Sequence, residues 1–146
     1  MNRFAINGNN QFIKFTFLEV YGFPEKTSFK GGYDIKAIVD IASGEFKLQS
    51  VLFTSTGELY QFYSDLKKCN QDLFGKAHYT TYEKNLTFHV GYTGIGSTIV
   101  KGIFTGQSIG ENEFKFEFHS DQSFITIAIQ ELASIFSEYG GMKGLK

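Results

Sequence analysis

The sequence predicts an α+β fold, an antiparallel, hairpin-rich sheet of about seven or eight strands with two helices. Residues 31–68 and residues 97–138 each read as two strands followed by a helix, so one strand–strand–helix unit is used twice. Composition agrees, because 17 Phe, 8 Tyr and 16 Gly with 1 Pro suit strands and tight turns better than a helical bundle. The strands follow one another as hairpins, without the spacing that parallel units need, which indicates antiparallel pairing.

The first two strands are predicted from residues 2–7 and 12–18. Residues 2–7 suit a short edge strand. From Ile13 to Phe17 every second residue is apolar, which indicates a strand with one buried face. Residues 21–28 then form a loop, because a glycine and the single proline interrupt the alternation.

The first repeated unit begins with a hairpin of residues 33–41 and 46–53. Its first strand alternates apolar with mostly charged residues, and a turn that contains glycine leads to the second strand. In the second strand the apolar positions change from even residue numbers, as at Leu48, to odd ones, as at Val51. A change of parity inside a strand is what a β-bulge produces, so we expect a bulge near residues 49–50.

A helix is predicted directly after this hairpin. Ser55 and Glu58 match the capping box, in which a serine and a glutamate side chain satisfy free amides at the start of a helix. The apolar residues that follow at helical spacing predict the face that packs on the sheet: Leu59, Phe62, Tyr63, Leu66 and Cys69. We expect this helix to end near residues 68–70.

The second half of the chain repeats this order of elements. Residues 78–82 and 86–92 suit a third hairpin. Residues 98–104 and 114–119 suit a fourth, and a longer loop joins its two strands.

The closing helix is expected to start at Ser120 or Asp121. Its predicted apolar face consists of Phe124, Ile125, Ala128, Ile129, Leu132, Ile135 and Phe136. The whole pattern predicts a single α+β domain over residues 1–139. Residues 140–146 are rich in glycine, and we expect them to form a flexible C-terminal tail.

Composition excludes several classes of protein. The formal net charge of −1 provides no basic field for nucleic acid. No apolar run approaches the roughly 18 residues of a membrane span, and the first residues lack the pattern of a signal peptide. Cys69 is the single cysteine, which excludes an intramolecular disulfide and favours a reducing compartment. We therefore expect a soluble cytoplasmic protein that binds neither nucleic acid nor membranes.

No pattern in the sequence indicates catalysis. His78, His89 and His119 lie on predicted strands without the spacing of metal ligands, so we expect neither a metal nor a cofactor. Cys69 lies on the apolar face of the first helix, as an inert buried thiol does. We expect that the protein is not an enzyme. An enzyme remains a weaker alternative, and it would need two of these histidines beside a carboxylate in a cleft.

Acidic residues cluster on the last predicted strand. Glu113 and Glu117 share one exposed face there. A charged strand face is usually just solvated, but an acidic strip also suits a basic protein partner. The candidate partner-binding residues are Glu111, Glu113, Glu117, Asp121 and Tyr92.

Several stretches resemble one protein family. The sequences DLFGKAHYTTYE (residues 72–83), LTF (residues 86–88) and FEFHSDQSF (residues 116–124) are similar to the WapI-like immunity proteins. Residues 53–66, FTSTGELYQFYSDL, resemble the strand-then-helix element of that family. The likeness covers most of residues 10–138, and it lies in element order and scattered residues rather than in a catalytic signature.

The resemblance implies a cytoplasmic immunity protein. Such a protein binds the toxic C-terminal domain of a cognate contact-dependent toxin, often a nuclease, and masks it without chemistry. Specificity would come from complementary charges and from aromatic anchors in loops or termini. Candidate anchors are Tyr21, Phe23, Tyr92 and Tyr139. The alternative is a β-rich protein that binds a small ligand, with the 17 Phe lining an apolar cavity inside a curled sheet.

Overall fold

The computed structural model describes residues 2–106 and 112–145 of the chain. In that part eight strands and two helices confirm the predicted α+β class. Their bounds are β1 (Arg3–Asn7), β2 (Phe12–Val20), β3 (Asp34–Ser43), β4 (Phe46–Ser55), α1 (Thr56–Asp72), β5 (Lys76–Thr80), β6 (Leu86–Tyr92), β7 (Ser97–Phe104), β8 (Phe114–Asp121) and α2 (Gln122–Tyr139).

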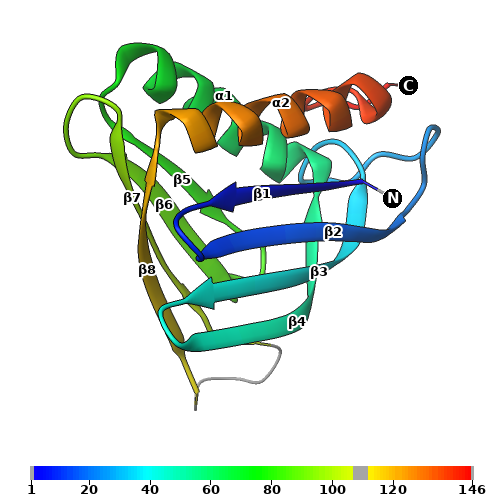
Figure 1. Ribbon diagram of the computed structural model, residues 1–146. Helices are drawn as coiled ribbons and strands as arrows, with labels where there is room; N and C mark the ends of the chain where they lie inside the picture. The colour runs from blue at the N-terminus through cyan, green and yellow to red at the C-terminus, as the bar shows by residue number, and fades with distance from the viewer. Residues whose placement is uncertain (1, 107–111, 146) are drawn as a thin grey trace.

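The strands are divided between two antiparallel sheets rather than joined in one. The first sheet has the order β1-β2-β3-β4 and the second the order β5-β6-β7-β8. Figure 1 shows the two sheets facing each other, with α1 and α2 lying together across one end. The repeated unit of the sequence is thus β3-β4-α1 and β7-β8-α2, so each sheet runs into one helix.

Aromatic side chains from both sheets meet in the core. The Phe15 ring of β2 stacks on Phe4 of β1 at 4.8 Å and meets Tyr79 of β5 edge-on at 5.6 Å. The Phe88 ring of β6 lies 5.3 Å from that of Phe62 on α1. Burying one such ring contributes roughly 1.5–3 kcal/mol. The period-2 pattern of the strands and the 3.6-residue pattern of α1 therefore converge on one shared interior.

The prediction of a β-bulge near residues 49–50 is wrong. The register of β3 with β4 is continuous, and the irregular step lies between Phe17 and Glu19, where β2 pairs with β3. Val51 and Phe53 do not belong to the buried face, and Phe53 is 41% exposed. The prediction failed because it treated Phe53, which is exposed, as a core residue.

Both helices begin at the predicted caps. The Ser55 hydroxyl accepts a hydrogen bond from the Glu58 amide at 3.0 Å, which confirms the cap of α1. The Asp121 carboxylate accepts one from the Phe124 amide at 3.0 Å and so caps α2. The helix α1 runs a few residues beyond its predicted end, and Leu73 closes it in the left-handed conformation.

The segment after α2 folds back on the start of β3. The Gly32 amide donates to the Met142 carbonyl at 2.6 Å, and the Leu145 amide donates to the Tyr33 hydroxyl at 2.9 Å. Flexibility of residues 140–146 remains a prediction. Within residues 2–106 and 112–145, no helix is both long and apolar enough to cross a membrane.

Candidate partner-binding site

The predicted acidic strip on β8 is exposed, but lysines balance its charge. Glu117 lies 3.8 Å from Lys101 of β7, and Glu113 lies 3.9 Å from Lys115. Surface ion pairs of this kind contribute about 0–1 kcal/mol, so they balance charge more than they stabilise the fold. Glu111 lies outside the described residues.

The other two candidates of this group have structural partners. Asp121 caps α2, and the Tyr92 hydroxyl donates to the Asn70 side chain on α1. Burial raises the pKa of Tyr92 well above its usual value, so its hydroxyl stays protonated as the donor. Glu113 and Asp121 lie at opposite ends of β8, roughly 25 Å apart at the rise of an extended strand. The structure therefore does not gather these residues into one patch.

Exposed aromatic residues gather at a different place. Tyr21 and Phe29 of the β2–β3 loop, Phe53 of β4 and Tyr82 of the β5–β6 turn border one cavity of about 280 Å³. Phe29 is 79% exposed and Tyr82 is 58% exposed. We call this site the aromatic cleft, and its remaining lining residues are Lys30, Asp34, Ile35, Thr54, Glu58 and Glu83.

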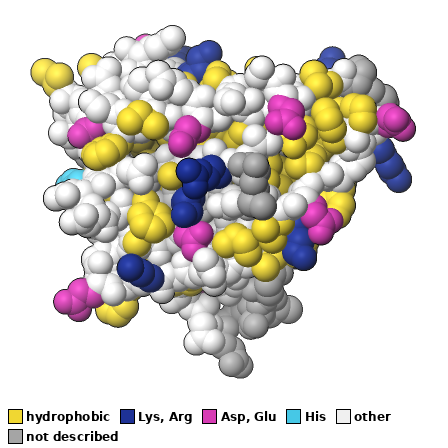
Figure 2. Space-filling view, turned by 45° about the vertical axis from the view of Figure 1, so that its right-hand side comes forward, with side chains coloured by type: hydrophobic (Ala, Val, Ile, Leu, Met, Phe, Trp, Pro, Cys, Tyr) yellow, Lys and Arg dark blue, Asp and Glu magenta, His cyan; other side chains and the backbone are white. Residues whose placement is uncertain are grey.

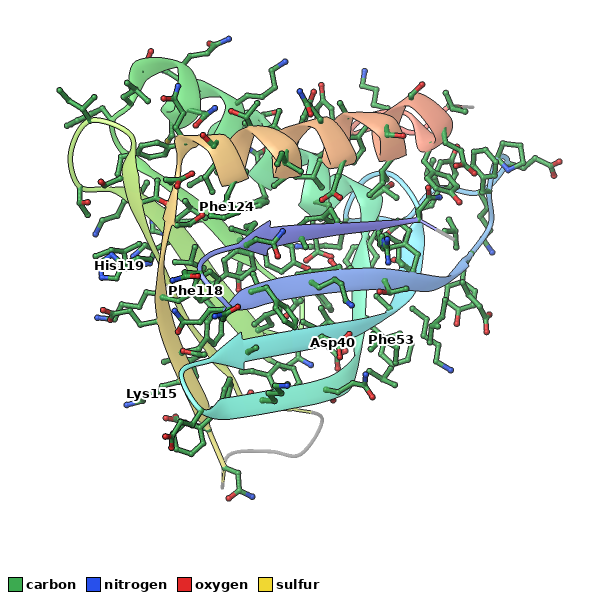
Figure 3. The ribbon with its side chains drawn as sticks, viewed as in Figure 1. Asp40, Phe53, Lys115, Phe118, His119 and Phe124 are labelled. Carbon is green, nitrogen blue, oxygen red and sulfur yellow. The ribbon has the colours of Figure 1, made fainter. Side chains whose placement is uncertain are left out.

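The aromatic cleft and the acidic strip lie on different sides of the molecule. Figure 3 shows Phe53 on the opposite side from Lys115 and His119 of β8. In the second sheet, β5, which leads to the turn with Tyr82, and β8, which carries the acidic strip, are the two outer strands. On the side that Figure 2 presents, exposed hydrophobic side chains lie among charged ones of both signs. Charge alone therefore does not distinguish a binding surface on that side. The grouping of exposed aromatic rings is a more specific sign of a binding site.

Local structure holds Tyr82 in position at the cleft. The Thr81 hydroxyl accepts hydrogen bonds from the amides of Asn85 and Leu86, so the β5–β6 turn is tied at its base. The Phe29 ring meets the Tyr82 ring edge-on at 5.2 Å. The Lys30 ammonium lies 4.9 Å from the centre of the Tyr82 ring. Two loops far apart in the sequence thus fix one exposed ring.

A chain of hydroxyl groups leads from the core to the cleft. The buried Tyr79 hydroxyl donates to Thr54 Oγ1 at 2.6 Å, and Thr54 Oγ1 donates to Glu58 Oε1 at 3.5 Å. Burial raises the pKa of Glu58, while hydrogen bonds from Ser55, Thr54 and the Tyr82 backbone and the charge of Lys30 act against that rise. These hydrogen bonds and the charge of Lys30 therefore do not fully offset the cost of burying the charged Glu58 carboxylate.

A second hollow of about 430 Å³ adjoins the aromatic cleft. The two share Lys30, Glu58 and Tyr82 in their walls, so the Lys30–Tyr82 contact stands between them. Lys84 also lines the second hollow, which makes it less acidic than the aromatic cleft.

Of the three histidines, His78 lines the second hollow together with Glu58, whereas His89 and His119 line neither of the two hollows. His78 and His89 are paired across β5 and β6, with ring centres 5.5 Å apart, and they face away from the core. Burial and the charge of Lys76 lower the pKa of His89. His119 lies on β8, two strands away from β6. Among the described residues no three side chains of metal-ligating type come together.

Several of the phenylalanines expected to line a ligand cavity pack in the interior instead. Phe88 lies between the rings of Phe15, Phe62, Tyr79 and Phe116, with ring centres 5.3 to 6.5 Å away. These distances are those of direct aromatic contact. The arrangement is a packed sandwich core, so it gives no support to the small-ligand alternative.

The sequence identified one of the four cleft aromatics. Tyr21 was a candidate anchor, and it lines the cleft. Tyr139 was another, but it is buried and packs on Phe23 and Tyr33, so its place in the core corrects that expectation. Phe29 was missed, although an aromatic residue in a polar loop, where no strand or helix would bury it, is a signal that could have found it. Tyr82 was missed because the predicted strand of residues 78–82 included it, whereas β5 ends at Thr80.

Comparison with known proteins assigns the chain to a family. The sequence model of a family described as the Immunity protein WapI-like family matches residues 3–140. No curated protein and no solved structure matches the chain. The match covers nearly all of the chain and confirms the resemblance drawn from the sequence.

Proposed function

The chain belongs to the WapI-like immunity protein family, and we propose that it binds the toxic C-terminal domain of a cognate contact-dependent toxin and blocks it. We further propose that it acts in the cytoplasm and that the aromatic cleft is the centre of the contact. Membership in an immunity family supports a protective role.

The observation that carries this proposal is the grouping of exposed aromatic rings. Single exposed apolar residues are ordinary on a protein surface, but several around one hollow are typical of a binding site. Tyr21, Phe29, Phe53 and Tyr82 come from three separate segments and border the same cavity. Aromatic anchors with a charged rim are the usual arrangement of residues that dominate binding energy.

Inhibition by this surface would be masking rather than chemistry. The Tyr82 ring already meets the Phe29 ring edge-on, so little side-chain freedom is lost when a partner covers it. Asp34, Glu58 and Glu83 line the same cavity as the aromatic rings. A toxin that cleaves nucleic acid has a basic active surface, and this acidic rim would complement it.

The acidic residues of β8 remain proposed contacts of a second kind. Glu113 and Glu117 are exposed but paired with lysines. Their neighbour Lys115 lies on the opposite side of the molecule from Phe53 of the aromatic cleft (Figure 3). We propose that these two glutamates and Glu111 affect the rate of association more than the strength of the complex. We propose Asp121 and Tyr92 as separate contacts, with Asp121 at the other end of β8 from Glu113.

Growth protection tests the proposal. The toxin domain encoded beside this protein is expressed in bacteria together with the wild type, Phe29→Ala or Tyr82→Ala. Because each variant removes an anchor, we expect a loss of protection and at least a tenfold weaker complex, as about 2 kcal/mol at an anchor residue implies.

Phe74→Ala is the matched control for these two variants. Phe74 is 77% exposed but lies before β5, whereas Tyr82 lies beyond the other end of that strand. This variant should protect like the wild type. The proposal fails if the wild type neither binds the toxin domain nor protects cells from it, and its placement at the cleft fails if both cleft variants protect fully.

A further inference from the structure

The aromatic cleft carries more negative than positive charge. Among the described residues that line it are three acidic residues, Asp34, Glu58 and Glu83, and one basic residue, Lys30. Four aromatic residues line the same cavity. Rings and carboxylates together favour a cation, because ring faces attract positive charge and carboxylates pair with it.

Lys30 shows how a cation sits at this place. Its ammonium lies 4.9 Å from the centre of the Tyr82 ring, and its charge also acts on Glu58. A cation of the chain itself thus occupies the ring face beside the partly buried carboxylate. Lys30 is exposed and belongs to a loop, so it can turn away toward water when another cation arrives.

We infer that the aromatic cleft receives an arginine side chain of the partner, whose guanidinium group pairs with Glu58 and stacks on the Tyr82 ring. This inference rests on the proposed function and names the chemistry of its contact. Arginine fits better than lysine, because its planar group can bond a carboxylate through two N–H groups and stack on a ring at the same time.

The size and rigidity of the site agree with this occupant. A cavity of about 280 Å³ lies just below the usual 300–1,000 Å³ range of small-molecule sites and suits one long side chain. Thr54 and the buried Tyr79 hydroxyl position the Glu58 carboxylate from behind. The walls of Tyr21 and Phe53 offer apolar surface for the arginine stem.

Titration of the full-length protein with a small probe tests the inference. The probe is Nα-acetyl-L-arginine N-methylamide, followed by NMR of the Glu58 and Tyr82 side chains. Its control is the matching citrulline compound, which has the same shape but no charge. We expect saturable shifts with the arginine probe at millimolar concentration and at least tenfold weaker binding of the citrulline probe.

Three variants sharpen this test. Glu58→Gln should abolish the saturable shifts, and Glu45→Gln, in the exposed β3–β4 turn, should leave them unchanged. Lys30→Met should tighten binding severalfold, because it removes the competing ammonium. This exposed substitution gives a gain of binding that a folding defect could not mimic.

The inference is overturned by the absence of saturable shifts, by equal binding of the two probes, or by full binding to Glu58→Gln. These outcomes differ from failure of the proposed function. If arginine does not bind while Tyr82→Ala still abolishes protection, the arginine contact is wrong and toxin inhibition stands. If arginine binds but the protein neither captures nor blocks the toxin domain, the proposed function is wrong.

Discussion

At the scale of single residues, Glu58 combines two opposing roles. Burial raises its pKa above the usual value near 4.5, which means that its charged form weakens the folded state. Asp34 and Glu83 line the same cleft and add negative charge, while Lys30 offsets part of it. A carboxylate that does not favour folding is typical of a residue kept for binding, as we propose for this one.

The pH dependence of stability should show this property. Because the folded protein holds the Glu58 proton more tightly than the unfolded chain, stability falls as pH rises from about 4.5 through the raised pKa. Glu58→Gln removes this loss, so the variant should melt at the same temperature as the wild type, or higher, at pH 7. Below pH 4 the advantage should vanish.

Thermal unfolding between pH 4 and pH 7 measures this effect, with Glu45→Gln as the exposed control. A wild type that gains stability over Glu58→Gln as pH rises would contradict the assignment.

At the scale of elements, the start of α1 organises the cleft. The Thr56 hydroxyl accepts a hydrogen bond from the Tyr33 amide at 2.8 Å, and the Gly57 amide donates to the Gly31 carbonyl at 3.1 Å. The first turn of α1 thereby fixes the end of the loop that carries Phe29, while Glu58 projects from the same turn. One helix start thus positions residues on both sides of the cleft.

Ser55→Ala should therefore affect stability and binding together. Loss of the cap that accepts the Glu58 amide should cost about 0.5–2 kcal/mol of unfolding free energy. It should also loosen the turn that holds Glu58 and weaken the toxin complex. Ser64→Ala, at an exposed position of the same helix, should stay within about 0.5 kcal/mol of the wild type.

Denaturant unfolding and calorimetric titration measure these two effects. Unchanged stability of Ser55→Ala would show that this cap does not hold the helix start.

The elements were predictable where local patterns determine them. Alternation found the strand around Phe15, and the Ser55–Glu58 pair found the start of α1, because each depends on neighbours in the sequence. The division into two sheets and the cleft depend on contacts between distant segments. Phe29 meets Tyr82 only after the fold brings two loops together, so no local pattern could announce that contact.

At the scale of the whole molecule, two sheets share one core and remain joined along different sides. The Ser43 hydroxyl of β3 donates to the Glu117 carbonyl of β8 at 3.0 Å, while Tyr79 and Thr54 join β5 to β4. Figure 1 shows that the helices cover one end of this arrangement. The aromatic cleft lies where the β2–β3 loop and the β5–β6 turn meet beside the start of α1.

The shared core makes the two sheets one cooperative unit. Phe88 contacts rings of the first sheet, of α1 and of its own sheet, so Phe88→Ala should cost about 3–5 kcal/mol of unfolding free energy. Phe46→Ala, at a ring that is 70% exposed in the β3–β4 hairpin, should cost less than about 0.5 kcal/mol. Chemical denaturation measures both values, and equal small losses would contradict a common core.

Hydrogen exchange of the complex with the cognate toxin domain tests the central proposal most directly. If the partner covers the aromatic cleft, exchange should slow most in residues 21–34 and 81–85, which carry three of its four aromatic rings. Residues 113–121 of the acidic strip should change little by comparison. Protection concentrated in residues 113–121, with the two cleft segments unchanged, would contradict the account.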